Sequence, residues 1–387
     1  MSDDLSEAPA HDAQLDTFLE LRKPGAHLDD DYAPDDFVLM LGVDLVHYTR
    51  FPKAVDDGVT FARGDLDIRQ QLDVDSGAEL EDYSGPYRPD LRYTDFSVDA
   101  LYERVLPYSE QYLLATVDAW ADEVASRYGR ETMAEIEWAA WNDQVAPEIP
   151  RMVGEFLPPG TTYVDPNQTV PESDRSRTRV VYTGLFSPDE RFRDLTKAEL
   201  VTLVLGSHEY LLQCIEGWAA QIVVRDGLDT MFDIQFQLWG DTVLPARTRL
   251  MSEYLGISGS TVADWMKDLQ MDATAMPGKA FDLTFEMPEP DVGIMTFNRC
   301  VAVDQWEAMG RPDILEKNCH STCPKSMIVT TKLYDPNMKV DILAIPPRRD
   351  PGDVCCRWRF SMRDESDPEY VPVELSSRPA RSGRADD

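Results

Sequence analysis

The fold is decided by residues 112–157, YLLATVDAWADEVASRYGRETMAEIEWAAWNDQVAPEIPRMVGEFL, and by residues 210–255, YLLQCIEGWAAQIVVRDGLDTMFDIQFQLWGDTVLPARTRLMSEYL. The two stretches align without a gap at a constant offset of 98 residues. The matched positions include Trp120 with Trp218, Gly129 with Gly227, Trp141 with Trp239 and Pro147 with Pro245. Self-similarity at a fixed spacing indicates that one structural unit has been duplicated.

Each copy is predicted to be a three-helix unit. Ser97 and Thr196 are good N-caps, and Glu199 completes a capping box with Thr196, so a helix should begin after each cap. A second helix should carry the first matched tryptophan and end at the matched glycine, because a residue with positive φ often closes a helix. A third should span 132–157 in one copy and 230–255 in the other, with a kink at the matched proline. We expect the copies to superpose and their four tryptophans to be buried.

Residues 276–363 have the pattern of a small α+β domain. Strands are predicted from Val292 to Cys300, over 338–345 and over 354–362. Helices are predicted over 303–310 and 324–333, the second because Pro324 suits a first helical turn. The fold class is therefore α+β: duplicated three-helix units followed by a small C-terminal α/β domain with an antiparallel sheet of about three strands.

Composition divides the chain into six segments. Both ends are polar and poor in apolar periodicity, which is typical of disordered tails, and a Pro- and Ser-rich segment separates the two repeats. The predicted segments are a disordered acidic tail (1–35), an N-terminal region with repeat 1 (36–160), a linker (161–193), repeat 2 (194–275), the cysteine-containing α+β domain (276–363) and a disordered tail (364–387).

Charge limits the kinds of partner. The 387 residues include 71 acidic against 37 basic side chains, and the net charge is −34. Such a surface repels nucleic acid and anionic membranes, and no apolar run is long enough to span a bilayer. The N-terminal MSDDLSEAPAHD has neither the basic nor the apolar part of a signal peptide. We therefore expect a cytoplasmic protein whose partner is a small-molecule ligand or substrate, and a homo-oligomer is left open.

Cysteines mark the candidate site. Cys319, His320 and Cys323 lie close to the predicted start of a helix, where the helix dipole favours a thiolate. Cys300 and Cys356 lie in predicted strands that could bring them to the same point. Thiolates and imidazole are good Zn²⁺ ligands. Cys300, Cys319, Cys323 and Cys356 are therefore predicted zinc ligands, with His320 as an alternative fourth ligand.

Two other interpretations of the cysteines stay open. One is a catalytic thiol without metal, and the other is a set of small buried side chains with a structural role only. Cys355 and Cys356 are neighbours on a predicted strand, so their side chains point to opposite faces and only one should join the site.

Several features between residues 194 and 362 occur in a recognisable order. They are a Trp-containing helix pair with a Gly between, a strand ending in Cys300, then Gly310 and Cys319, Asp335-Pro336, a strand reaching Pro346-Pro347, and Asp353 before Cys356, Trp358 and Phe360. In this order they resemble the L-2-amino-thiazoline-4-carboxylic acid hydrolase family, whose pattern favours Cys356 over Cys355. The strand that begins near Gly352-Asp353 is also loosely similar to vinyl-reductase-type ligand-binding domains, some of which bind zinc through cysteines. Pro346-Pro347 stands where that second pattern has a cysteine.

The resemblance implies a hydrolase that opens a small cyclic amidine or thiazoline ring at a C–N bond. A zinc-bound water or the Cys319 thiolate would attack the C=N carbon, and His320 would transfer the proton. The alternative is a non-enzymatic small-molecule-binding or sensor protein with a structural zinc–cysteine site and a pocket among its helices. An assembly protein without a ligand also fits the repeats.

Overall fold

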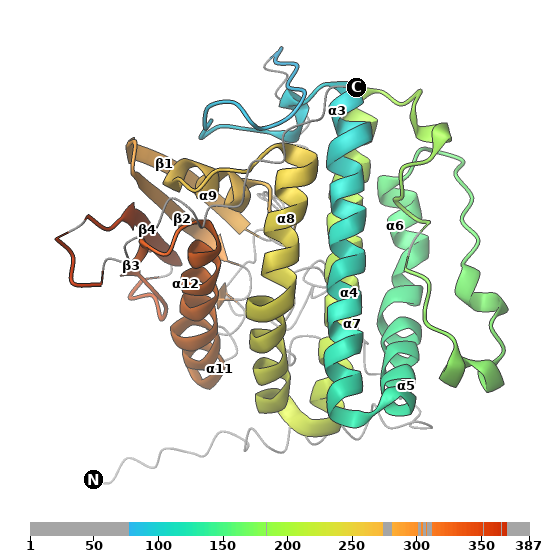
Figure 1. Ribbon diagram of the computed structural model, residues 1–387. Helices are drawn as coiled ribbons and strands as arrows, with labels where there is room; N and C mark the ends of the chain where they lie inside the picture. The colour runs from blue at the N-terminus through green and yellow to red at the C-terminus, as the bar shows by residue number, and fades with distance from the viewer. Residues whose placement is uncertain are drawn as a thin grey trace, which may run out of the picture.

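The computed structural model describes residues 77–182, 184–273, 281–300, 303–304, 307, 312–350, 352–364 and 366–369. A bundle of long helices lies beside a four-stranded antiparallel sheet (Figure 1), so the α+β class is confirmed. The helices are α3 (Val98–Ala100), α4 (Leu106–Tyr128), α5 (Arg130–Ala140), α6 (Ile149–Phe156), α7 (Lys197–Leu238), α8 (Leu244–Leu255), α9 (Val262–Gln270), α11 (Pro312–Lys317) and α12 (Cys323–Tyr334). The strands are β1 (Phe281–Glu289), β2 (Val292–Cys300), β3 (Met338–Ala344) and β4 (Cys356–Met362).

Some predicted segments lie outside this description. The N-terminal tail, residues 36–76 and most of the C-terminal tail are among them, and of the helix predicted over 303–310 only Val303, Asp304 and Glu307 are described. Among the helices of the described ranges, none combines the length and the hydropathy that crossing a bilayer requires.

The predicted caps are confirmed, but the first two helices of each copy are continuous. The Ser97 side chain accepts a hydrogen bond from the backbone N–H of Ala100, and Thr196 forms the capping box with Glu199. A π-helical turn joins α3 to α4, and α7 runs on from its cap without a break before Gly227. The boundary expected between the first and second helices is therefore wrong.

Gly206 lies where that boundary was expected in the second copy. A Cβ atom added there would lie 2.4 Å from Phe186 and 2.7 Å from Phe156, so the glycine allows close packing instead of a turn. No proline interrupts this part of the helix. Nothing in the local sequence stops the helix here. Burial of its apolar residues then stabilises one continuous helix.

The matched glycines and prolines act as predicted. Gly129 and Gly227 have φ values of 86° and 83° and separate the helix that carries the first tryptophan from the next. A π-helical turn occurs in both copies, at Trp141–Val145 and at Trp239–Val243, two residues before the matched proline. Proline would clash with the carbonyl group four residues earlier, and the wider turn relieves this clash. The elements follow the 98-residue offset here, and superposition of the copies stays a prediction.

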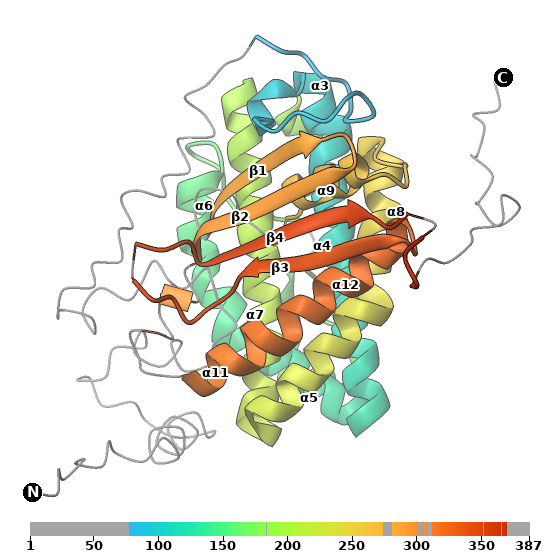
Figure 2. The same ribbon diagram turned by 90° about the vertical axis from the view of Figure 1, so that its left-hand side faces the viewer.

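The sheet has one strand more than expected. Its order is β1-β2-β4-β3, with every neighbouring pair antiparallel, and in Figure 2 the strands lie in front of the helices. The additional strand is β1, whose residues 281–289 lie outside the three predicted strands. The alternation of Phe281, Leu283, Phe285 and Met287 with polar residues is the period-two signal of a half-buried strand.

Helix α9 connects the sheet to the bundle. Trp265 is buried and its ring lies 5.6 Å from that of Phe360 on β4 and 5.5 Å from that of Tyr334 on α12. Together with Met295 and Trp358 these residues form a second core between α9, α12 and the sheet. The position of the sheet therefore depends on the position of α9.

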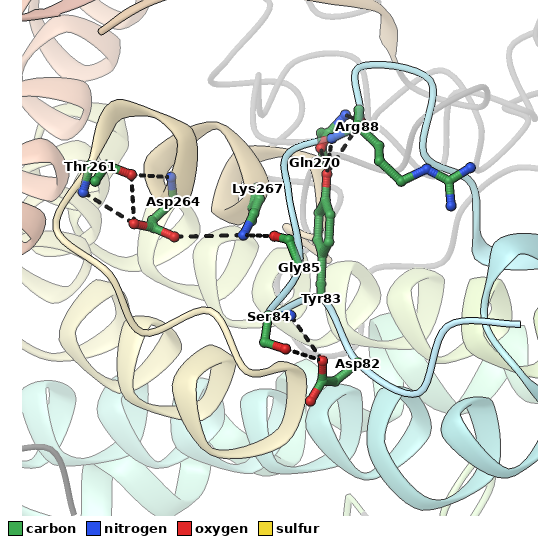
Figure 3. Close-up of polar contacts among 9 residues, drawn as sticks. All are labelled: Asp82, Tyr83, Ser84, Gly85, Arg88, Thr261, Asp264, Lys267 and Gln270. Carbon is green, nitrogen blue, oxygen red and sulfur yellow. Dashed lines mark hydrogen bonds and ion pairs between the residues drawn. The ribbon is translucent and has the colours of Figure 1, made fainter. Parts of the chain in front are cut away.

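The segment before the first repeat holds α9 from its other side (Figure 3). Tyr83 Oη donates a hydrogen bond to Gln270 Oε1 at 2.8 Å, and Gln270 Nε2 donates to the carbonyl of Arg88 at 2.8 Å. Lys267 Nζ donates to the carbonyl of Gly85 at 2.6 Å. These contacts fix α9 between the N-terminal segment and the sheet.

The segment predicted as a linker, 161–193, packs on the bundle. Its apolar side chains Val180, Tyr182 and Phe186 are buried in the main core. Trp138 Nε1 donates to the Thr178 carbonyl at 2.8 Å. The segment is therefore part of the folded unit around the helices.

The matched tryptophans differ in burial, which predicts different costs of truncation. Trp141 is 1% exposed and packs edge-on against Tyr182, whereas Trp239 is only partly buried. We expect Trp141→Ala to lower the free energy of unfolding by about 3–5 kcal/mol, the usual range for an aromatic cavity. Trp239→Ala should cost roughly half as much, because part of its ring has no packing partner to lose. Chemical denaturation followed by circular dichroism measures both, and equal losses would contradict the difference in burial.

A buried histidine predicts how stability depends on pH. His208 on α7 contacts Ser109 Oγ through Nε2 at 3.1 Å, and burial lowers its pKa to about 3. Below pH 6.5 His208 binds a proton in the unfolded chain but stays neutral in the folded chain. The free energy of unfolding therefore decreases as the pH falls. Relative to His208→Gln, the wild-type free energy of unfolding should fall by up to about 1.4 kcal/mol per pH unit between pH 6 and 4. The prediction is wrong if the wild type and His208→Gln lose the same free energy of unfolding across this pH range.

Candidate functional site

A cavity of about 260 Å³ lies between the helix bundle and the sheet. Apolar side chains from the helices and from β1 and β2 form most of its wall, and five of the lining residues are aromatic: Tyr112, Trp239, Trp265, Phe281 and Phe297. Ligand sites are typically such concave, mainly apolar spaces with a few polar groups. An apolar cavity of roughly 150 Å³ is enough to hold benzene, so this cavity has room for a larger molecule.

The local sequence explains why the wall is aromatic. Alternation along β1 and β2 turns Phe281, Leu283, Met295 and Phe297 to the face that meets the helices. Trp239 begins the π-helical turn of the second repeat. Such turns often occur at functional sites, and here the turn leaves the indole ring on the cavity wall.

A buried ionic cluster lies at one end of the cavity. Arg247 on α8 is 3% exposed, pairs with Asp268 on α9 at 2.5 Å and also pairs with Asp272. Tyr334 Oη donates to Asp268 Oδ2 at 2.5 Å. Burial raises the pKa of Asp268 to about 6, although Arg247 opposes this change. Arg247 and Asp272 line the cavity, so its apolar space ends at a charged group held by two carboxylates.

The predicted cysteines gather where β2, β4 and the α11–α12 helix meet. Cys300 ends β2, and its backbone N–H donates to Cys355 Sγ at 3.1 Å. Cys356 Sγ accepts from Trp358 Nε1 at 3.2 Å, and Cys323 Sγ accepts from Asn318 Nδ2 at 3.6 Å. The thiols are near enough to raise one another's pKa. The structure thus brings the cysteines into one region.

The environment of these cysteines differs from the predicted one. Cys319 and Cys323 lie inside a continuous helical segment formed by α11, the π-helical turn Asn318–Thr322 and α12. They are therefore not at the free N-terminus that would favour a thiolate. Burial instead raises the pKa of Cys319 well above its usual range and that of Cys323 to about 11. Both thiols are protonated at neutral pH.

Cys319 and His320 do not share a site. Cys319 is buried, whereas His320 is exposed and its Nε2 lies 2.5 Å from the Pro346 carbonyl oxygen. His320 borders a separate shallow depression together with Lys317. Of the predicted site residues, Cys323 is the one that lines the main cavity. The proposed transfer of a proton between Cys319 and His320 has no geometric support.

Metal binding stays a prediction. In the part of the chain that the structure describes, no group of three or more His, Cys, Asp or Glu side chains is arranged to hold a metal ion. The predicted convergence of Cys300, Cys319 and Cys356 on one metal therefore has no support in this arrangement.

Comparison with protein-family models, curated proteins and solved structures gave no match to this chain. The resemblance to the hydrolase family and to the vinyl-reductase-type domains therefore stays a prediction. The function of the cavity is therefore inferred from the residues that line it.

Sequence reasoning did not identify the polar end of the cavity. Arg247, Asp268 and Asp272 look like ordinary surface charges in a helical pattern. Asp268 and Asp272 are spaced i and i+4 in DWMKDLQMDA, a spacing that would place both on one face if the helix continued to Asp272. That spacing was the one local sign that they face the interior.

The raised pKa of Cys323 predicts slow alkylation. At pH 8 its thiolate fraction should be about 100-fold lower than that of an ordinary cysteine, because its pKa is about two units higher. Iodoacetamide labelling of the native and the urea-unfolded chain, followed by peptide mass spectrometry, measures the ratio. The native rate should increase as the pH approaches 11. Equal rates in both states at pH 8 would contradict the raised pKa of Cys323.

Proposed function

We propose that this chain binds a small, largely apolar molecule in the cavity between the helix bundle and the sheet. The observation that carries the proposal is an aromatic-walled space of about 260 Å³ that ends at the buried Arg247–Asp272 pair. Well-packed interiors contain few voids larger than a water molecule. A space of this size, with polar groups at one end, has the composition of a ligand site.

Binding here would couple two parts of the fold. Leu212 belongs to α7 and Trp239 to the π-helical turn that follows it, whereas Phe281 and Phe297 belong to the sheet. A ligand between them contacts both and stabilises their relative position, because it binds only the folded arrangement. This favours the binding or sensor function over an assembly protein without a ligand.

Hydrolysis of a cyclic amidine or thiazoline is a second proposal, carried by the presence of the Cys323 thiol on the cavity wall. Its protonated state argues against direct attack at neutral pH unless a metal such as Zn²⁺ lowers its pKa. Turnover of an aminothiazoline together with about one zinc per chain by elemental analysis would support this proposal.

Filling the cavity tests the binding function. N-phenyl-1-naphthylamine is an uncharged fluorophore whose emission rises in apolar surroundings, and we expect saturable one-site binding to the wild-type chain. Ser326 on α12 lines the cavity, so Ser326→Trp should abolish this binding by occupying the space.

Ser321→Trp is the matched control. Ser321 lies on the same helical segment but borders the shallow depression near His320. This variant should bind the fluorophore as the wild type does. Absence of saturable binding to the wild type, or equal binding to Ser326→Trp, would refute the proposal.

A further inference from the structure

Two hydrogen-bond donors on the cavity wall have no acceptor in the part of the chain that the structure describes. Tyr112 on α4 is fully buried and Arg247 is 3% exposed, and both residues line the cavity. Neither the Tyr112 Oη–H nor the Arg247 Nε–H has an acceptor among the described residues. A buried donor left without an acceptor costs about 1–3 kcal/mol, and more when it is charged. These two atoms are therefore the groups that a bound molecule would satisfy.

The two donors belong to one place. Burial raises the pKa of Tyr112, and the neighbouring Arg247 guanidinium opposes this change through its charge and through a side-chain hydrogen bond to the hydroxyl oxygen, which leaves the O–H of Tyr112 as a donor. A single acceptor oxygen between the phenol and the guanidinium could therefore meet both groups. Two of the aromatic side chains, Trp265 and Trp239, line the same cavity as these donors.

The charges nearby decide what kind of acceptor fits. Both terminal nitrogens of Arg247 already pair with carboxylates, those of Asp268 and Asp272. A ligand carboxylate would therefore meet two like charges next to an arginine whose charge is compensated. A ligand ammonium group has only donors, so it could not satisfy Tyr112 Oη–H and Arg247 Nε–H.

We propose that the ligand is an uncharged aromatic or alicyclic molecule with a carbonyl or amide oxygen, which accepts hydrogen bonds from Tyr112 Oη and Arg247 Nε. Its ring lies among Trp239, Trp265, Phe281 and Phe297. This inference rests on the proposed function of the cavity as a binding site, and it assigns the chemical class that the cavity selects.

Four probes of one size test the selection. Benzamide, benzoate, benzylamine and toluene each carry one ring and differ in the polar group. Their inhibition constants are measured by displacement of N-phenyl-1-naphthylamine from the wild-type chain at pH 7.5. We expect benzamide to bind tightest. Benzoate or benzylamine binding as tightly as benzamide would overturn the assigned class, while fluorophore binding would still support the cavity as a site.

Tyr112→Phe tests the donor itself, because it removes only the hydroxyl group. It should weaken benzamide about fivefold to tenfold, the usual effect of one hydrogen bond, and leave toluene unchanged. Tyr108→Phe is the matched control. Tyr108 is equally buried, stacks on Tyr112 at 6.0 Å and also has an unpaired hydroxyl, but it lies outside the described lining of the cavity.

The outcomes separate the two proposals. Unchanged benzamide affinity in Tyr112→Phe, or an equal loss in Tyr108→Phe, would refute the role of Tyr112. If neither the fluorophore nor any of the four probes binds to the wild-type chain, the cavity is not a binding site and both proposals fail.

Discussion

The ion pairs of Arg247 hold the two layers of this molecule together. Arg247 projects from α8, whereas Asp268 lies on α9 and Asp272 just after it, and Tyr334 of α12 donates to the same Asp268 carboxylate. Removing one member of such a buried group leaves an uncompensated charge, which is costly. The bundle, α9 and the sheet domain are thus constrained to one arrangement. The cavity is lined by residues of α7 and of the sheet, so its shape depends on this arrangement.

A site at a junction of this kind has a physical consequence for function. Its walls come from both helical repeats, from α12 and from the sheet, so none of these parts contains the site alone. The N-terminal segment contributes indirectly, because Tyr83 and the backbone carbonyls of Gly85 and Arg88 position α9. The affinity of the cavity therefore depends on contacts that lie outside it, as expected for residues that orient a binding wall.

Local sequence signals predicted the parts of the fold that depend on local physics. Caps at Ser97 and Thr196, positive φ at Gly129 and Gly227 and the breaks before Pro147 and Pro245 follow from the backbone preferences of those residues. The continuity of α7 through Gly206 could not be predicted this way. It depends on Phe156 and Phe186, which approach from distant parts of the chain. The alternation of apolar and polar residues along β1 is also a local signal, and it is sufficient to predict that strand.

Local sequence signals did not predict which residues form the candidate site. Cysteines are conspicuous in a sequence, yet burial keeps the Cys319 and Cys323 thiols protonated, and the helix that contains them gives neither thiol a free N-terminus. Tyr112, Arg247 and Asp272 carry no recognisable sequence signal. They line one cavity only because α4, α8 and the end of α9 come together in the fold. Titration chemistry depends on burial and neighbours more than on residue type. A sequence therefore reveals candidate reactive groups, whereas the fold determines which of them face a ligand.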